Sequence, residues 1–137
     1  MYFLENIKME EKQLLELNKY ISKDILLTKE NVLELINNKS SSLKEIGRID
    51  LTNSILENII LTFTDSSFID KNNYMDNFLS LTKIFLYYEK TFSKKLSSEE
   101  ILKYLKDEFE KNEGSIELIS TISLERLQDK LCKYYKK

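Results

Sequence analysis

Residues 71–92, KNNYMDNFLSLTKIFLYYEKTF, carry the strongest structural signal in the sequence. Their apolar and aromatic side chains recur in steps of four and three, which is the spacing of one face of an α-helix. This seam comprises Tyr74, Phe78, Leu81, Phe85, Tyr88 and Phe92, and Met75, Leu79 and Leu86 widen it on one flank. The pattern predicts a long central helix against which the rest of the chain packs.

The aromatic residues are concentrated in and just before this segment. Eight of the fifteen Phe and Tyr residues lie between residues 63 and 92. Most fall on the predicted seam, and Phe63 and Phe68 stand where they can close the preceding loop onto it. The aromatic density therefore indicates a hydrophobic core more than a binding site.

The remainder of the chain also reads as helical. Apolar residues recur at helical spacing throughout, the sustained alternation typical of strands is rare, and no proline interrupts the patterns. We predict an all-α protein, a single compact bundle of about five to seven helices that forms one domain over residues 1–137. A simple up-and-down bundle is not expected, because one predicted helix is too short to match the central one.

The first helix is expected over residues 3–20. Its apolar side consists of Phe3, Ile7, Leu14, Leu17 and Ile21. Glu10 interrupts this stripe, so a loosely attached N-terminal helix within residues 1–26 is the alternative to a tightly packed one.

A second helix is predicted to begin after Thr28, whose hydroxyl can accept a hydrogen bond from a first-turn amide. One face stays mostly apolar through the polar run NNKSSS at residues 37–42, although Lys39 lies on it. We therefore favour one continuous helix over two helices divided by a loop at residues 40–42. Gly47 is the expected C-terminal cap, because glycine adopts the left-handed conformation at low cost.

A short, buried third helix is predicted to begin at Asp50 or Thr52 and to reach Phe63. The next residues, TDSSFID at 64–70, are typical of a turn, and Asp70 is placed to cap the central helix.

The clearest boundary lies near the C-terminal third of the chain. Ser97 and Glu100 match the capping-box pattern at the start of a fifth helix, which we expect to end near Gly114. A last helical region follows from Ser115, and the run STIS at residues 120–123 can divide it.

The composition excludes several kinds of chemistry. The chain has no His, one Cys and two isolated glycines, so Ser-His and Cys-His pairs, imidazole zinc ligands, CxxC redox motifs and a phosphate-binding loop are ruled out. We therefore expect no catalytic residues, no cofactor and no metal ion. A carboxylate-dependent enzyme using Asp65, Asp70 and Asp76 is the third-ranked hypothesis, since capping and turn formation explain Asp65 and Asp70 more simply.

The sequence points to the cytoplasm. No apolar run approaches the length of a membrane span, and Glu5 together with the absence of a small-residue cleavage site argues against a secretory signal. The single cysteine, Cys132, fits a reducing compartment and reads as a packing residue.

Two features are candidates for contact with a partner. Ile84 and Tyr87 project from the central helix away from its seam, so either they are buried or they form an apolar patch for another protein or a second copy. The basic C-terminus offers Lys133, Tyr134, Tyr135, Lys136 and Lys137, which could stack on bases, although a solvated helix end explains the same pattern.

The leading functional hypothesis is a non-enzymatic helical protein that acts through protein–protein interaction. It rests on the missing catalytic residues and on the extra apolar positions of the central helix. The alternative is a regulator that contacts nucleic acid through the basic C-terminal residues.

Three stretches also resemble a known family: GRIDLTNSILENIILTFTDSSFIDKNNY at residues 47–74, IFLYYEK at 84–90 and GSIELI at 114–119. The family comprises small proteins of unknown function from clostridia-like Firmicutes, and the resemblance covers residues 27–131. The matching positions are Gly47, Arg48, Ile55, Leu56, Phe63, Asp65, Ser66, Asp70, Tyr74, Phe85, Tyr87, Tyr88, Gly114 and Ser115. The resemblance implies a helical bacterial protein and supplies no site.

Overall fold

The computed structural model describes residues 2–21, 25–47, 54–92, 95–120 and 126. Within these residues it contains six α-helices, one 3-10 helix and no strand. The elements are α1 (Tyr2–Glu16), the 3-10 helix η1 (Leu17–Lys19), α2 (Lys29–Glu45), α3 (Ser54–Phe63), α4 (Tyr74–Phe92), α5 (Ser98–Lys111) and α6 (Ile116–Leu118). The predicted all-α bundle is confirmed.

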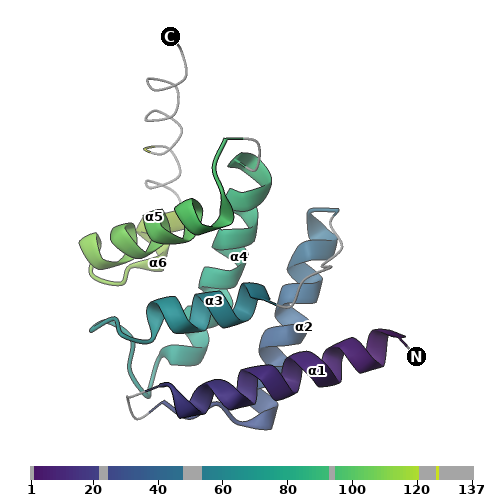
Figure 1. The fold of residues 1–137 in the computed structure, drawn as a ribbon. Coiled ribbons are helices and arrows are strands. Elements are labelled where there is room, and N and C mark those ends of the chain that lie inside the picture. Colours follow the sequence, from purple (N-terminus) through teal and green to yellow (C-terminus); the bar gives the residue numbers. More distant parts are fainter. Residues whose placement is uncertain (1, 22–24, 48–53, 93–94, 121–125, 127–137) are drawn as a thin grey trace.

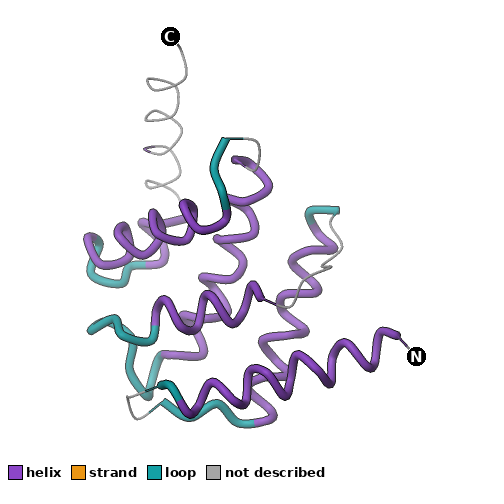
Figure 2. The backbone as a smooth tube through the Cα atoms, viewed as in Figure 1, coloured by secondary structure: helices purple, strands orange, loops and turns teal. Residues whose placement is uncertain are grey.

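The helices form two crossing layers. Helices α2 and α4 pack against each other and run upward in Figure 1, while α1, α3 and α5 cross them. Helix α1 contacts α3, and α3 contacts α5, so these three make up the second layer. Figure 2 shows that the described backbone is mostly helix, joined by short loops.

Helix α4 is the centre of the core, as its sequence predicts. It packs against α2, α3, α5 and α6. The seam residues Phe78, Leu81, Phe85, Tyr88 and Phe92 are buried. The ring centroids of Tyr88 and Phe92 lie 6.0 Å apart in an edge-to-face arrangement, which aromatic quadrupoles favour. Most of the aromatic density of the sequence is therefore core.

The loop before α4 closes onto α5. The Phe63 ring meets the Phe109 ring edge-on at 5.3 Å, and the Phe68 ring lies 6.5 Å from the same Phe109. Ile69 is buried beside them. Both Phe63 and Phe68 thus help to close the core, and the ring that receives them belongs to α5.

Helix α4 begins at Tyr74, three residues later than the predicted start, because residues 71–73 form a turn. The capping role of Asp70 is confirmed. Its carboxylate accepts hydrogen bonds from the backbone N–H groups of Asn72 at 2.8 Å and Asn73 at 3.1 Å. In return, Asn73 Oδ1 accepts a bond from the Asp70 N–H at 2.8 Å.

The first helix ends earlier than expected, at Glu16, and residues 17–19 tighten into η1. The Asn18 side chain explains how this end is held. Its amide donates to the Leu27 carbonyl and accepts from the Leu27 N–H, both at 2.9 Å. Leu14 and Leu17 are buried, so this part of the N-terminal segment packs into the core.

The predicted caps of α2 and α5 are confirmed. Thr28 Oγ1 accepts from the Asn31 N–H at 3.1 Å, and Asn31 Oδ1 accepts from the Thr28 N–H at 3.0 Å, which closes a capping box. Ser97 and Glu100 form the same reciprocal pair at the start of α5. Helix α2 runs unbroken through residues 37–42 and is followed by Gly47 at φ +71°.

A buried ion pair joins α1 to α2. The Lys39 ammonium lies 2.5 Å from Glu10 Oε2, and the two side chains are 2% and 5% exposed. Glu10, which interrupts the apolar stripe of the first helix, is itself buried. It sits inside the core because Lys39, on the apolar face of α2, neutralises it.

Some predictions lie outside the described residues. These are the start of the third helix at Asp50 or Thr52, the division of the last helix within residues 121–125, and Cys132.

The two glycines provide a matched test of backbone strain. Both have positive φ, but a Cβ at Gly114 would lie 2.7 Å from Phe68 Cβ, whereas a Cβ at Gly47 would meet no atom of the described residues within 4 Å. Gly47→Ala should lower the free energy of unfolding by about 1 kcal/mol, and Gly114→Ala by about 2–4 kcal/mol. Urea denaturation measures both values. Equal losses would show that Phe68 yields to the added methyl group.

The buried ion pair provides a second test. Glu10→Gln should cost about 3 kcal/mol, because it removes the carboxylate charge that pairs with the buried Lys39 ammonium. The double variant Glu10→Leu/Lys39→Met should be more stable than Glu10→Gln, since it buries no charge. Urea denaturation measures the free energy of unfolding of both variants. A double variant less stable than Glu10→Gln would contradict the cost assigned to the buried charge.

Candidate functional site

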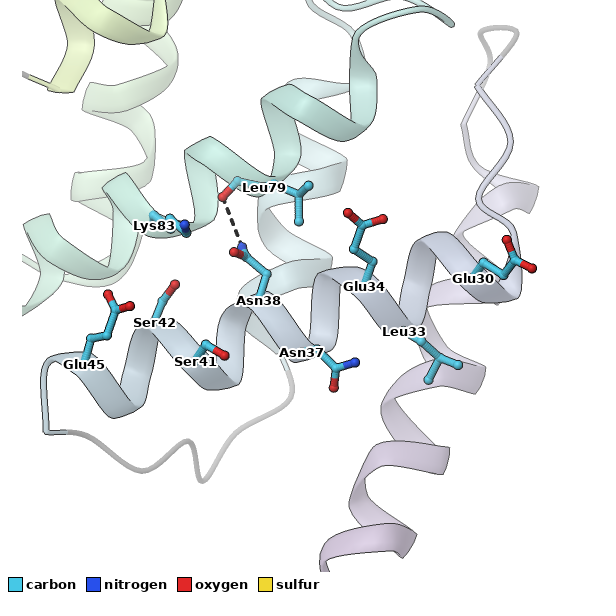
Figure 3. A pocket seen from close by; sticks show the side chains of 10 residues that line it. All are labelled: Glu30, Leu33, Glu34, Asn37, Asn38, Ser41, Ser42, Glu45, Leu79 and Lys83. Carbon is cyan, nitrogen blue, oxygen red and sulfur yellow. Dashed lines mark hydrogen bonds between the residues drawn. The ribbon is translucent and has the colours of Figure 1, made fainter.

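A groove of about 700 Å³ lies between α2 and α4 (Figure 3). Helix α2 forms most of it and α4 supplies the opposite wall. The α2 residues are Glu30, Leu33, Glu34, Asn37, Asn38, Ser41, Ser42 and Glu45, and the α4 residues are Leu79 and Lys83. Six of the ten are exposed, so the groove is open to solvent.

The polar run at residues 37–42 produces this groove. Val32, Leu35, Ile36 and Leu43 are buried on one face of α2. Because helical side chains repeat every 3.6 residues, the amides and hydroxyls of the polar run fall mostly on the other face and its edge. The run looked like a possible loop in the sequence, and in the fold it is the floor of a surface groove.

One hydrogen bond sets the spacing of the groove walls. The Asn38 side-chain amide on α2 donates to the Leu79 carbonyl on α4 at 3.1 Å (Figure 3). This bond joins the two helices beside the partly buried Leu79 side chain. The groove is thus a fixed feature of the α2–α4 packing.

Ser42 is the unusual residue of the groove. Its side chain is 5% exposed, and its Oγ is a buried polar atom without a hydrogen-bond partner among the described residues. Figure 3 shows it pointing from α2 toward the α4 wall. Buried hydroxyls are normally paired, because losing the bonds to water without replacement is unfavourable. An unpaired hydroxyl at this position is what a bound group could satisfy.

The groove carries more negative than positive charge. Glu30, Glu34 and Glu45 line it together with the single cation Lys83. Among the described residues none of these three carboxylates forms an ion pair. The groove therefore provides hydrogen-bond acceptors and a negative electrostatic potential, and both favour a hydrogen-bond donor or a cation.

The sequence candidates Ile84 and Tyr87 do not form one exposed patch. Ile84 is 8% exposed and belongs to the core, whereas Tyr87 is 51% exposed. Tyr87 follows Leu79 and Lys83 at four-residue spacing, so it lies one turn beyond Lys83 on the same side of α4. The structure thus separates the pair and places Tyr87 next to the groove.

The acidic residues near the start of α4 have structural roles. Asp65 forms an ion pair with Lys106 of α5 at 2.7 Å, and Asp70 is the helix cap. Asp76 is exposed. In the part of the chain that the structure describes, no three potential metal ligands come together.

A buried polar cluster joins α4, α5 and the residues after α6. Glu108 accepts from the Tyr104 hydroxyl at 2.8 Å and lies 3.3 Å from the Arg126 guanidinium, while the Tyr88 hydroxyl donates to the Ile119 carbonyl at 2.8 Å. Burial, and then the nearby Glu108 charge, raise the pKa of Tyr88 above its usual range. Burial and the bond to Glu108 do the same to the pKa of Tyr104. Both hydroxyls stay protonated and act as structural donors.

The basic C-terminal candidates Lys133, Tyr134, Tyr135, Lys136 and Lys137 lie outside the described residues. The nucleic-acid hypothesis based on them therefore stays a prediction.

Sequence reasoning did not find the groove. Its lining comes from two helices that are far apart in the chain, and surface glutamates and asparagines are ordinary helix residues. The one available signal was the density of hydroxyl and amide side chains at residues 37–42, which are poor helix formers yet lie in the middle of a helix.

The chain belongs to a family of unknown function (DUF6323), which matches residues 13–137. The match begins earlier and ends later than the resemblance at residues 27–131 had indicated, so it includes the end of α1. No curated protein and no solved structure matches the chain. Within the described residues, no helix has the length and apolar character needed to cross a bilayer.

Ser42→Ala tests the unpaired hydroxyl. It should raise the free energy of unfolding by about 1 kcal/mol, because it removes a buried group without a partner and adds a better helix former. Ser41→Ala, at the exposed neighbouring position, is the control and should gain only about 0.5 kcal/mol from helix propensity. Chemical denaturation compares them. A loss of stability in Ser42→Ala would show that the hydroxyl is satisfied in the free protein.

Proposed function

We propose that this protein is not an enzyme and acts by binding another protein, with the α2–α4 groove as its contact surface. The proposal is based on the Ser42 hydroxyl, which is buried in an acidic groove and has no hydrogen-bond partner within the described part of the chain. A native fold keeps such a group at a cost to its stability. Binding of a polar partner group would remove that cost.

The shape and polarity of the groove favour a macromolecular partner. Sites for small molecules are mostly enclosed and apolar. Here eight of the ten lining residues are polar, and the two others are Leu33 and Leu79. A partner that lies along α2 can reach the whole row of polar groups at once, which a compact small molecule cannot.

Tyr87 adds an aromatic side chain to the same face. It is half exposed and one turn from Lys83. Tyrosine is enriched in protein interfaces because it contributes large contact area and a polar tip. The partner surface expected from the sequence thus keeps Tyr87 and gains the groove, while Ile84 supports it from the core.

A non-enzymatic role agrees with the composition. The chain has no His and one Cys, so the usual pairs of nucleophile and base are not available to it. Asp65 and Asp70, the carboxylates on which a metal-dependent enzyme would have depended, serve an ion pair and a helix cap. We place its action in the cytoplasm, in agreement with the single cysteine.

Site-specific photo-crosslinking tests the proposal. A benzoyl-phenylalanine at Asn37, exposed in the groove, should form a discrete adduct with one protein in the cells that make this chain. The same group at Asp107, exposed on α5, is the matched control and should not form that adduct. The double variant Glu34→Lys/Glu45→Lys should abolish the adduct at position 37 without changing the circular dichroism spectrum, because it reverses the charge of the groove.

The mass of the adduct distinguishes the possible partners. An adduct of twice the mass of the chain would identify self-association through the groove. Equal adducts from positions 37 and 107, or none from position 37, would show that the groove is not the contact surface.

A further inference from the structure

We propose that the groove holds one arginine side chain of the protein partner, whose guanidinium donates hydrogen bonds to Ser42 and Glu45. The arginine is an anchor of the partner inferred above, so this site rests on the proposed function and specifies the chemistry that the groove recognises.

Three hydrogen-bond acceptors follow one another along α2. They belong to Asn38, Ser42 and Glu45, and Figure 3 shows these side chains pointing from α2 toward the α4 side of the groove. Steps of four and three residues place them on one face of the helix, about 6 Å and about 4.5 Å apart along its axis. The groove thus presents a short row of acceptors in addition to its negative charge.

Each of the three side chains has an acceptor atom for a ligand. Asn38 uses its side-chain nitrogen to donate to the Leu79 carbonyl at 3.1 Å, so its Oδ1 remains as the acceptor. Glu45 is exposed and forms no ion pair with another described residue. The Ser42 Oγ has no hydrogen-bond partner in the part of the chain that the structure describes. A ligand that brings several donors therefore matches this row better than one that brings acceptors.

Ser42 distinguishes this position from an ordinary acidic surface. Its side chain is more than nine-tenths buried, yet it lines the groove and points toward the gap between the helices. The Oγ atom itself is covered in the free protein, so a ligand reaches it after the side chain rotates about the Cα–Cβ bond to another staggered rotamer. The hydrogen bond formed there offsets the cost of the unpaired hydroxyl.

A guanidinium fits the row of acceptors better than an ammonium does. Its N–H donors diverge within one plane, so at N···O distances of about 2.9 Å it can bridge acceptors about 5–7 Å apart. An ammonium directs all its donors from a single atom, and the acceptors bonded to it lie within about 5 Å of one another. A guanidinium is also less strongly hydrated, which suits a site partly covered by two helices.

The rest of the groove suits a side chain of this shape. Glu30 and Glu34 extend the negative charge toward the start of α2, which attracts a cation. Leu79 on the opposite wall is partly buried against the core, and the methylene groups of an arginine can pack on it. Arginine is also among the side chains that contribute most to the affinity of protein interfaces.

Lys83 makes the charge of the ligand measurable. It lies on the α4 wall of the groove and is exposed. Its ammonium repels a guanidinium and would attract an anionic ligand. Lys83→Met should therefore tighten the binding of an arginine about two- to threefold, the effect of one exposed charge pair. The same change would weaken the binding of an anion.

Amide NMR chemical shifts of the isotope-labelled protein test the site. The probes are the N-acetyl amides of arginine, lysine, citrulline and glutamate, compared at constant ionic strength, and citrulline keeps nearly the shape of arginine without its charge. The arginine probe should give saturable shifts in the groove segments of α2 and α4, with a Kd on the order of 1 mM. It should bind at least about fivefold more tightly than each of the other probes.

Variants locate the bound guanidinium. Ser42→Ala and Glu45→Gln should each weaken binding of the arginine probe about fivefold, because each removes one acceptor. Ser42→Ala is expected to be more stable than the parent protein, so loss of folding does not explain its effect. Ser40→Ala, at an exposed position of α2 outside the groove lining, and Asp107→Asn on α5 are the matched controls and should leave the affinity unchanged.

Each alternative outcome overturns a defined part of the assignment. Equal binding of the arginine and lysine probes would refute the guanidinium, and weaker binding of arginine by Lys83→Met would refute the charge of the ligand. Binding that neither Ser42→Ala nor Glu45→Gln alters would refute the location.

The photo-crosslinking result separates this site from the proposed function. If the arginine probe gives no saturable shift up to on the order of 20 mM while the position-37 adduct forms, the arginine anchor is wrong and the protein-binding function stands. If the probe binds as expected but that adduct is missing, the groove recognises a guanidinium and the proposed function fails.

Discussion

The burial of helix α4 is the constraint on which the structure depends. Its buried side chains include members of the predicted seam and others off it, such as Ile84 and Leu86. A single neighbouring helix cannot cover so wide a surface, so α2, α3, α5 and α6 all pack on α4. Among the helix positions left over, Lys83 and Tyr87 are exposed. The same requirement that builds the core therefore leaves a narrow polar strip on α4 beside α2.

Helix α2 carries two buried polar residues that differ in their interaction partners. Lys39 has a charged partner, Glu10, at 2.5 Å, while the Ser42 hydroxyl has no hydrogen-bond partner that the described residues supply. An ammonium left in the core without its carboxylate would lower the stability by about 3–5 kcal/mol. A lone hydroxyl costs far less, about 1–3 kcal/mol, and a marginally stable protein can carry it. Ser42 therefore lowers the stability of the free protein, and a partner group that hydrogen-bonds to its hydroxyl would offset that loss.

The features that the sequence predicts correctly depend on interactions between residues close together in the chain. Helix caps at Thr28 and Ser97, the glycine after α2 and the α4 seam all depend on residues a few positions apart, and each was confirmed. The pair between Glu10 and Lys39 was not predicted, because nothing in the chain connects two residues twenty-nine positions apart before α1 and α2 are docked. Periodicity also could not decide whether Ile84 was covered, since that depends on how many helices surround α4.

The candidate site was harder to predict for the same reason. Its walls come from two helices whose contact, marked by the bond from Asn38 to Leu79, spans forty-one positions. Only Tyr87 was identified from sequence, through its place off the seam. The polar run at residues 37–42 was visible, but whether it formed a loop, a solvated face or a groove depended on the position of α4.

The contrast between α5 and α2 distinguishes the groove from an ordinary charged surface. On α5, Lys106 lies 2.7 Å from Asp65 and 3.5 Å from Glu110, and Glu108 is bound by Tyr104. These particular charges are paired within the fold, although Asp107 on the same helix is exposed. On α2, the glutamates of the groove form no ion pair among the described residues, although Lys83 lines the same groove. Exposed carboxylates alone are common on helices. Carboxylates arranged in a row above a buried hydroxyl that lacks a partner are not, and this combination is why we assign recognition to α2 instead of α5.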